Sequence, residues 1–216
     1  MVQGASSGRV IIGLLLAAGR GSRYSPDGSA NKLLAQVDGQ PVCVAAARAL
    51  GAALPRLAAA TSPAAPAVAD ALGRAGCEVI VCDRSAAGMG ATLAQAVTHL
   101  MESTRAAGDD APAWCVMPAD MPWLHPATVA TLRDAWLALP PGRREQAVLA
   151  PTYRDVRGHP VLFGPGWGPR LAMLDGDEGA RRLVAGQVMP IPVSDPGCLR
   201  DVDTPDDLAR GPTQLA

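Results

Sequence analysis

Residues 16–23 form a glycine-rich segment whose composition suits phosphate binding. The segment reads LAAGRGSR and directly follows an apolar stretch. Small residues allow backbone N–H groups to approach phosphate oxygens, and Arg20 or Arg23 adds a charged, forked donor. No Walker A motif is present, and Tyr24 stands where a dinucleotide fingerprint needs its third glycine. We therefore expect a phosphate loop of another kind, with an ordinary turn after a strand as the alternative.

Lys32 is the only lysine of the chain, which has 19 cationic residues in all. It stands where the loop returns to the apolar segment Leu33-Leu34-Ala35. A lysine at the edge of a phosphate loop supplies a mobile point charge, which a planar guanidinium does not replace. We expect Lys32 and Arg23 to neutralise a triphosphate and its leaving pyrophosphate. The alternative is a chance survivor of a general drift towards arginine.

Asp120 lies between Pro118 and Pro122, at the end of a short apolar stretch. Prolines fix φ, so this carboxylate is held rigidly where a strand ends. One or two carboxylates together with substrate phosphates are what Mg²⁺ prefers. The sequence therefore predicts a metal ligand at Asp120, with a turn-forming or helix-capping aspartate as the alternative.

A second acidic group lies near the carboxyl end of the chain, in the segment DVDTPDD over residues 201–207. In an extended segment, Asp201 and Asp203 point to the same side. Asp203 or Thr204 is also a candidate N-cap for a short helix, and Asp206 and Asp207 suit its first turn. A metal site shared with Asp120 requires this segment to fold back beside it.

The segments between these groups alternate between strand-like and helix-like patterns, which predicts a parallel sheet with helices on both faces. Strands are expected at residues 10–17, 57–61, 78–82, 114–117, 147–151, 159–163 and 188–193, with a hairpin around residues 154–158. Helices are expected at residues 41–54, 63–75, 93–107, 126–139, 178–185 and 205–209.

The composition excludes several classes of protein. With 216 residues, 49% of them hydrophobic, the chain can bury a core, and its net charge of −1 argues against a nucleic-acid partner. The apolar run over residues 10–18 is about half of a membrane span, so no membrane association is expected. Five cysteines without C-x-x-C spacing, and no convincing secretory signal, indicate the cytoplasm. We expect one domain over residues 10–210, with tails at 1–9 and 211–216.

Seven motifs in register resemble a known family. In order they are L-A-A-G-x-G-x-R, K-L-L, G-M-G-x-T-L, P-A-D-M-P, G-H-P-V-L-F, G-D-x-G-A-R and D-V-D-T-P-D-D-L. Together they resemble the MobA-like nucleotidyltransferases, and most of all the molybdenum cofactor cytidylyltransferase (MocA-like) branch. The resemblance extends from Ile11 to Leu208.

This resemblance implies a Rossmann-like three-layer α/β/α nucleotidyltransferase fold with a mostly parallel central sheet. It implies Mg²⁺-dependent transfer of CMP from CTP to molybdopterin or the molybdenum cofactor, with release of pyrophosphate and a molybdenum hydroxylase as a possible recipient of the product. One alternative is a different small phosphorylated acceptor. Another is a non-catalytic, cofactor-binding accessory protein of a molybdenum hydroxylase.

The resemblance also assigns roles to single residues. The implied catalytic residues are Arg23, Lys32 and Asp120, and the implied metal ligands are Asp120 and Asp203. The implied nucleotide-binding residues are Leu16, Ala17, Ala18, Gly19, Gly21, Arg23, Lys32, Gly88, Met89, Gly90, Thr92, Pro118 and Ala119. The implied acceptor-binding residues are His159, Asp177 and Arg181, although a histidine between glycine and proline can also simply close a hairpin. The spacing from Arg23 to Lys32 is longer than the family pattern, and Thr92 replaces its common serine with another hydroxyl.

Overall fold

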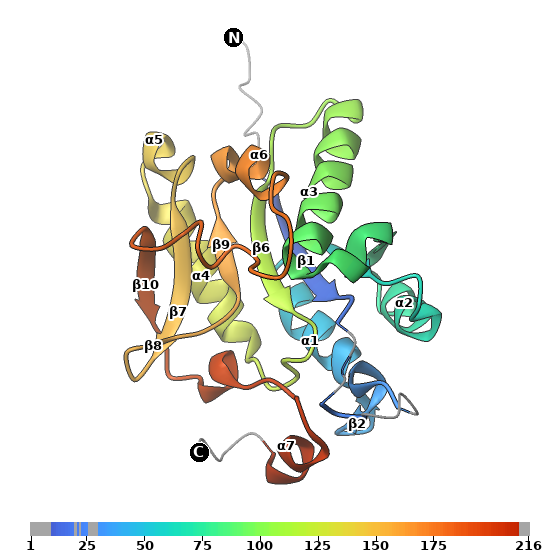
Figure 1. Cartoon of the computed structure of the whole chain (residues 1–216). Helices are drawn as coiled ribbons and strands as arrows, with labels where there is room; N and C mark the ends of the chain where they lie inside the picture. Colours follow the sequence, from blue (N-terminus) through green and yellow to red (C-terminus); the bar gives the residue numbers. More distant parts are fainter. Residues whose placement is uncertain (1–9, 20, 22, 26–29, 212–216) are drawn as a thin grey trace.

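The computed structural model describes residues 10–19, 21, 23–25 and 30–211, in which an eight-stranded sheet is flanked by helices on both faces (Figure 1). The strand order is β10-β7-β9-β6-β1-β4-β5, and β8 pairs with β7. The bounds are β1 Ile11–Ala17, β4 Arg56–Thr61, β5 Glu78–Val81, β6 Ala113–Pro118, β7 Val148–Tyr153, β8 Val156–Arg157, β9 Val161–Phe163 and β10 Val188–Pro192. The strands pair in parallel, except that β9 is antiparallel to β6 and β7, and β8 to β7. The expected mostly parallel sheet is confirmed.

Helices and short turns connect these strands. The α-helices are α1 Val42–Gly51, α2 Pro66–Arg74, α3 Met89–Ala106, α4 Pro126–Ala138, α5 Pro141–Arg144, α6 Gly168–Leu171 and α7 Pro205–Arg210. The 3-10 turns are η1 Lys32–Leu34, η2 Asp83–Ala87, η3 Pro165–Trp167 and η4 Pro196–Leu199, and β2 Gln36–Val37 pairs with β3 Gln40–Pro41. Among the described residues, no helix is both long and apolar enough to cross a membrane.

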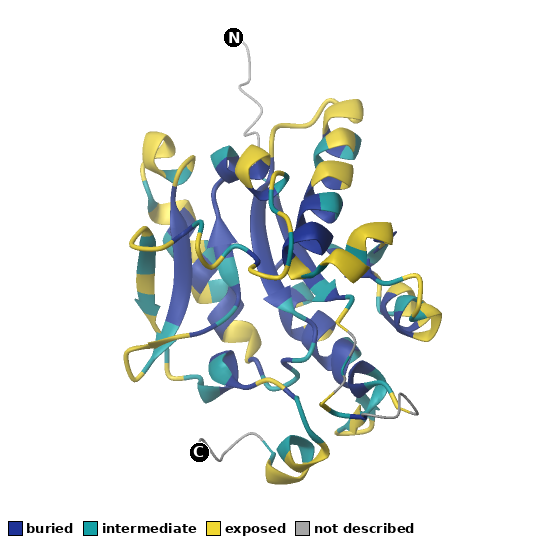
Figure 2. Ribbon diagram, viewed as in Figure 1, coloured by how far each residue is buried: buried dark blue, intermediate teal, exposed yellow. Residues whose placement is uncertain are grey.

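The central strand β1 is buried on both faces, as its continuous apolar sequence predicts. Ile11 and Leu15 enter the core under α1, α2 and α4, whereas Ile12 and Leu14 enter the core under α3 and α6. Figure 2 shows β1 and β6 buried along their lengths between these two helical layers. A side chain at Gly13 would overlap Leu50 and Leu57, so glycine lets α1 pack closely on the strand.

Two of the expected helices differ from the structure by more than three residues. Residues 179–187 form successive turns instead of the helix expected over 178–185. Gly179 and Gly186 have φ values of 50° and 74°, which a right-handed helix cannot contain. The helix expected from Leu93 begins four residues earlier, at Met89, directly after Gly88 with its φ of 121°. The tail over residues 1–9, most of the tail over 211–216, and Arg20 lie outside the described residues.

The hairpin expected around residues 154–158 is present. Strands β7 and β8 pair through Thr152 with Arg157 and Tyr153 with Val156. Arg154 and Asp155 form the turn between them, with φ values of 49° and 63°. The chain then returns as β9 between β7 and β6.

The strand order places a crevice at the carboxyl ends of β1 and β6. From β1 the chain continues to β4 and β5 on one side, whereas β6 joins β1 on its other side. Open α/β sheets bind their ligands at such a reversal of strand order. The loops that follow β1 and β6 both leave the sheet at this edge, at the lower end of the sheet in Figure 1.

Candidate functional site

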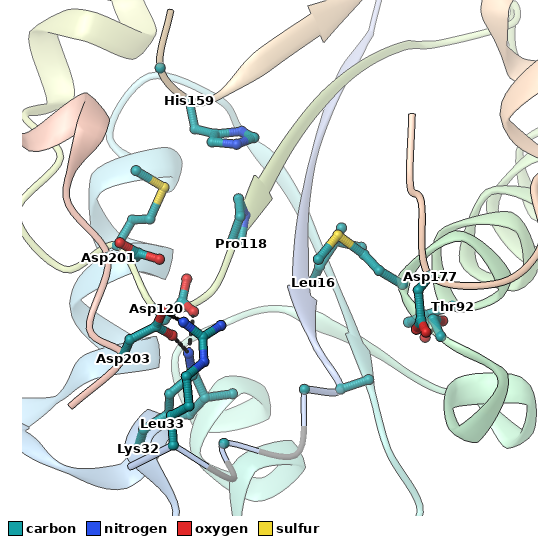
Figure 3. Close-up of a pocket in the computed structure, with 18 of the residues that line it drawn as sticks. Leu16, Lys32, Leu33, Thr92, Pro118, Asp120, His159, Asp177, Asp201 and Asp203 are labelled. Carbon is teal, nitrogen blue, oxygen red and sulfur yellow. Dashed lines mark hydrogen bonds and ion pairs between the residues drawn. The ribbon is translucent and has the colours of Figure 1, made fainter. Parts of the chain in front are cut away.

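Three carboxylates from distant parts of the sequence meet beyond the end of β6. The backbone N–H of Val202 donates a hydrogen bond to the carbonyl oxygen of Asp120 at 2.9 Å. Val202 is fully buried, so Asp201 and Asp203 on either side of it both face Asp120. One ligand atom from each of the three residues lies within 4.8 Å of the others (Figure 3). The fold-back that a shared metal site requires is therefore present.

Lys32 inserts its ammonium among these carboxylates. Its Nζ lies 2.6 Å from Asp120 Oδ2 and 2.8 Å from Asp203 Oδ1. Asn31 sets the start of η1, because its side chain accepts a hydrogen bond from Leu33 N at 3.0 Å. Arg23 lies further out, with Nη1 at 2.5 Å from Asp203 Oδ2. The longer loop between Arg23 and Lys32 still brings both cations to one carboxylate.

The electrostatics of the cluster follow from burial and from these close charges. Burial by itself lowers the pKa of Lys32, but the charges and hydrogen bonds of Asp120 and Asp203 outweigh it, so the pKa is raised above its usual value. The pKa of Asp201 is also raised, first by desolvation of its carboxyl and then by the charges of Asp120 and Asp203. Lys32 therefore stays charged, whereas desolvation and then the neighbouring carboxylates disfavour the charged form of Asp201.

The carboxylate cluster fits a divalent cation. Asp120 Oδ1 is buried and has no hydrogen-bond partner among the described residues, while its other oxygen contacts Lys32. A buried carboxylate oxygen without a partner is costly, and a hard cation is the partner that carboxylates suit. Asp120, Asp201 and Asp203 are the residues that could hold such an ion.

The alternative role of Asp203 as a helix cap does not apply. Thr204 is the N-cap of α7, and its backbone N–H donates to Asp207 Oδ2 at 2.7 Å. The same oxygen accepts the backbone N–H of Asp203 at 3.0 Å. Despite desolvation, these hydrogen bonds lower the pKa of Asp207. The carboxylate of Asp203 is left to contact Lys32 and Arg23.

A cavity of about 780 Å³ opens beside the carboxylates. Its lining includes the predicted nucleotide-binding residues Leu16, Ala18, Gly19, Gly21, Arg23, Lys32, Gly88, Met89, Thr92 and Pro118, together with Asp120. Ala17, Gly90 and Ala119, also predicted to bind nucleotide, do not line it. Ala17 and Ala119 are buried in the sheet, where Ala119 N donates to Leu16 O at 3.0 Å. Gly90 N instead donates to Gly176 O at 2.7 Å, which ties the two loops together.

Glycine at position 88 allows the start of α3 to contact a distant loop. A Cβ there would lie 2.3 Å from Asp177 Oδ1 and 2.6 Å from the carbonyl oxygen of Gly176. Its φ of 121° is also a conformation that side chains rarely adopt. The hydroxyl of Thr92 donates to Gly88 O at 2.9 Å, which fixes the turn. Predicted nucleotide and acceptor residues thus lie side by side.

A second cavity, of about 950 Å³, adjoins the first. His159 and Asp177 line both cavities, and Arg181 lines the second. Its walls are mainly apolar, with Leu93 and Phe163 among them. The three residues predicted to bind an acceptor are therefore collected around one space next to the carboxylates.

His159 is fixed by a backbone hydrogen bond, and its imidazole is neutral near pH 7. The backbone N–H of His159 donates to Cys198 O at 2.8 Å, and the imidazole Nδ1 is buried without a hydrogen-bond partner among the described residues. Burial lowers its pKa to about 4, with the charge of Arg157 acting in the same direction and that of Asp120 against it. A neutral imidazole can donate or accept a hydrogen bond but adds no charge.

The sequence pattern indicates a common side for Asp201 and Asp203 but does not place Asp201 at the metal, and Asn31 and Arg157 were not predicted as site residues. The spacing of Asp201 from Asp203 was the available signal for the first. An asparagine shortly before an apolar run is a usual signal of an N-cap, and only Lys32 separates Asn31 from Leu33-Leu34-Ala35. Arg157 lines both cavities from β8, and no local pattern marks it.

Comparisons with known proteins agree with the fold described above. Rv0371c from Mycobacterium tuberculosis H37Rv is 28% identical, with a TM-score of 0.75 over 95% of this chain and 98% of that chain. A structure of Rv0371c in complex with manganese has the same identity, with a TM-score of 0.70 over 95% and 100%. A nucleotidyl transferase from Methanothermobacter thermautotrophicus shares the fold at 24% identity, with a TM-score of 0.70 over 95% and 97%.

The comparison with curated proteins gave no match. The family comparison matched residues 13–191 to the MobA-like NTP transferase domain, a range that runs from the third residue of β1 into β10. The chain therefore belongs to the MobA-like NTP transferase family.

Proposed function

We propose that this protein transfers CMP from CTP to a molybdopterin-type acceptor, with Mg²⁺ bound at its carboxylates and with release of pyrophosphate. The observation that carries the proposal is the meeting of Asp120, Asp201 and Asp203 with Lys32 and Arg23 on the lining of the first cavity. Anionic groups for a cation and cationic groups for phosphates are both needed to bind a metal–triphosphate. The structure of Rv0371c in complex with manganese supports the proposed divalent cation.

Binding and orientation are the tasks of the protein in this reaction. We assign Gly19 and Gly21 to the β- and γ-phosphates through their backbone N–H groups, together with Arg23 and Lys32. A bound Mg²⁺ supplies charge neutralisation at the α-phosphate. An acceptor phosphate oxygen forms a bond to the α-phosphorus while the bond from that phosphorus to the bridging oxygen breaks, and pyrophosphate leaves with the electron pair. Positioning and electrostatics carry such a reaction, with little covalent chemistry by the protein.

The second cavity is the place we assign to the acceptor. It shares His159 and Asp177 with the first cavity, so an acceptor phosphate there lies next to the triphosphate. Arg181 and the neutral His159 supply hydrogen-bond donors to that acceptor. The preference for CTP is proposed on Gly88, Met89, Gly90 and Thr92, which resemble the cytidylyltransferase branch.

A cytoplasmic location with a molybdenum hydroxylase as recipient completes the proposal. The five cysteines are buried free thiols, which suits a reducing compartment. The volume of the second cavity, about 950 Å³, suits a bulky acceptor and its product.

Pyrophosphate release tests the proposal most directly. Purified protein is assayed with CTP, GTP or ATP and Mg²⁺, each with and without molybdopterin. We expect release with CTP that depends on both molybdopterin and Mg²⁺. Release that depends on another phosphorylated acceptor would overturn the acceptor assignment. Molybdopterin binding without turnover of any nucleotide would instead identify an accessory protein.

A further inference from the structure

The ammonium of Lys32 stands where a divalent cation would contact Asp120 and Asp203. It lies 2.6 Å from an oxygen of the first and 2.8 Å from an oxygen of the second. The side chain of Lys32 is only 11% exposed, so this is an inserted position and not a surface contact. The metal ligands and the phosphate-binding cations of the proposed reaction therefore neutralise one another in this structure.

Asp201 differs from the other two carboxylates. Among the described lysines and arginines, none forms an ion pair with it, and it is the exposed member of the cluster, although the groups around it partly desolvate its carboxyl. It lies on the cavity lining together with Asp120 and Asp203. Asp120 in turn has one buried oxygen without a partner. The cluster thus offers an incoming cation an accessible carboxylate and, behind it, an oxygen that lacks a contact.

We propose that a divalent cation enters at Asp201 and displaces the Lys32 ammonium from Asp120 and Asp203, which frees Lys32 for the phosphates. This inference rests on the proposed function, because it takes the cation bound there as given. The stem of Lys32 passes beside Gly21, where a Cβ would lie 3.4 Å from Lys32 Cγ. An ammonium released from the carboxylates therefore stays next to the phosphate loop.

Charge balance is the physical reason for displacement. The three carboxylates exceed the charge of Lys32 and Arg23 by one, so the cluster is short of positive charge. A divalent cation added to both basic residues would make the cluster net positive, with two like charges in contact with the same oxygens. Departure of Lys32 restores neutrality. Repulsion between two cations that share the same carboxylate oxygens favours departure of the ammonium.

The single lysine allows the exchange to be observed directly. Protein labelled with [¹⁵N]lysine gives one side-chain ammonium signal, from Lys32. We expect this signal to be sharp without metal and to shift or broaden on titration with Mg²⁺. Asp201→Asn should move the transition to about tenfold higher Mg²⁺, whereas Asp206→Asn, on the exposed face of α7, should leave it unchanged.

Mn²⁺ binding provides the second measurement, followed by the electron paramagnetic resonance of the free ion. Lys32→Met removes the competing ammonium, so we expect it to tighten Mn²⁺ binding by about tenfold. Arg105→Met is the matched control, because it removes one positive charge from the exposed end of α3. Arg105 is at the end of α3 opposite to Met89 and Thr92, which line the cavity. Solvent ions screen an exposed charge there, so we expect Arg105→Met to change the Mn²⁺ affinity less than twofold.

The outcomes separate this inference from the proposed function. If Mg²⁺ displaces bound Mn²⁺ from the protein but the Lys32 signal stays unchanged, the proposed displacement of Lys32 is overturned and the metal site is left intact. Equal Mn²⁺ affinity of Lys32→Met and the parent chain would overturn it as well. Failure of the parent chain to bind either cation would overturn the exchange together with the metal assignment, and CTP turnover would then show whether the transfer reaction survives.

Discussion

At the scale of single residues, the site depends on the difference between an ammonium and a guanidinium. Lys32 contacts two carboxylates from one small charged group, inside a position that is nearly closed to solvent. Arg23 contacts the other carboxylate oxygen of Asp203, and its side chain is exposed. All other cationic residues of the chain are arginines, and its only lysine makes this buried contact.

Replacement of Lys32 tests this distinction. We expect Lys32→Ala to lower kcat with CTP about a hundredfold, or roughly 3 kcal/mol, because an electrostatic donor of the transition state is lost. Lys32→Arg should also lower kcat, since a planar guanidinium does not replace a compact, mobile ammonium at the phosphates. Arg105→Lys at the exposed end of α3 should have no effect. Full activity of Lys32→Arg would contradict the assignment.

Asp120 gives a second prediction at this scale. Asp120→Ala should lower Mg²⁺-dependent pyrophosphate release at least about a hundredfold, because the cluster loses its innermost carboxylate. Circular dichroism should show that the variant remains folded. Asp206→Ala, which removes an exposed carboxylate from α7, serves as the control and should keep full turnover. Unchanged turnover in Asp120→Ala would remove this residue from the site.

His159 predicts a pH dependence of stability. Its pKa is about 4 in the folded chain and about 6.5 when unfolded, so between these values only the unfolded chain takes up the proton. The free energy of unfolding should therefore fall as pH drops from 6.5 to 4, by up to roughly 3 kcal/mol, because each pH unit is worth about 1.4 kcal/mol. Urea unfolding of the parent chain and of His159→Gln measures this. Parallel curves for the two proteins would contradict the buried, neutral state of His159.

At the scale of elements, short structures place the charged groups. The turn η1, begun by Asn31, sets the direction of Lys32, and the start of α7 holds the backbone of Asp203 through Asp207. The 3-10 turn η4 brings Cys198 to His159. Each of these elements is short, and each carries one contact that the site needs.

Removal of the Asp207 side chain tests the role of α7. Asp207→Ala should lower the free energy of unfolding by about 1 to 2 kcal/mol, because two backbone N–H groups lose their acceptor. The neighbouring Asp206→Ala should cost less than about 0.5 kcal/mol. Urea unfolding near pH 7 compares them. The pKa of Asp207 is lowered in the folded chain, so its contribution is present at neutral pH and is lost as pH falls through that lowered value. Equal stability of the two variants would contradict the capping role.

At the scale of the whole molecule, the order of strands brings the site together. The carboxyl ends of β1 and β6 are neighbours although the α-helices α1, α2 and α3 and the strands β2, β3, β4 and β5 lie between them in the sequence. The loop after β1, the end of β6, the start of α3 and the segment before α7 converge there (Figure 3). The two cavities meet where the start of α3 contacts the loop around Gly176.

Gly88 provides a prediction about this convergence. Gly88→Ala places a methyl group against Asp177 and the backbone of Gly176, so we expect a raised KM for CTP and a loss of stability of about 1 to 3 kcal/mol. Gly108→Ala is the matched control, since Gly108 also has positive φ, 77°, but nothing within 4 Å of an added Cβ. Steady-state kinetics and urea unfolding measure both. A KM raised equally by the two substitutions would show that backbone strain alone is responsible.

Several features could be predicted from the sequence because they depend on neighbouring residues. The apolar run of β1 predicts a strand buried on both faces. The apolar residues after Pro126 recur at helical spacing, and helix α4 begins at Pro126 as expected. The helix expected over residues 178–185 was wrong. Its charged and apolar pattern suits a helix, but Gly179 near its start and Gly186 directly after its end both adopt positive φ. Local patterns report preference, and a glycine conformation is decided by what surrounds it.

The sequence by itself determined the alternation of strands and helices, the residue types of a phosphate and metal site, and the common side of Asp201 and Asp203. Only the tertiary structure decided that this pair faces Asp120, through the hydrogen bond from Val202 to its carbonyl oxygen. It also decided that Lys32 contacts the carboxylates, and that Asp203 is not a cap. The physical reason is range: backbone preferences act within a few residues, whereas hydrogen bonds and charge pairs join whichever residues the packed sheet brings within a few ångströms.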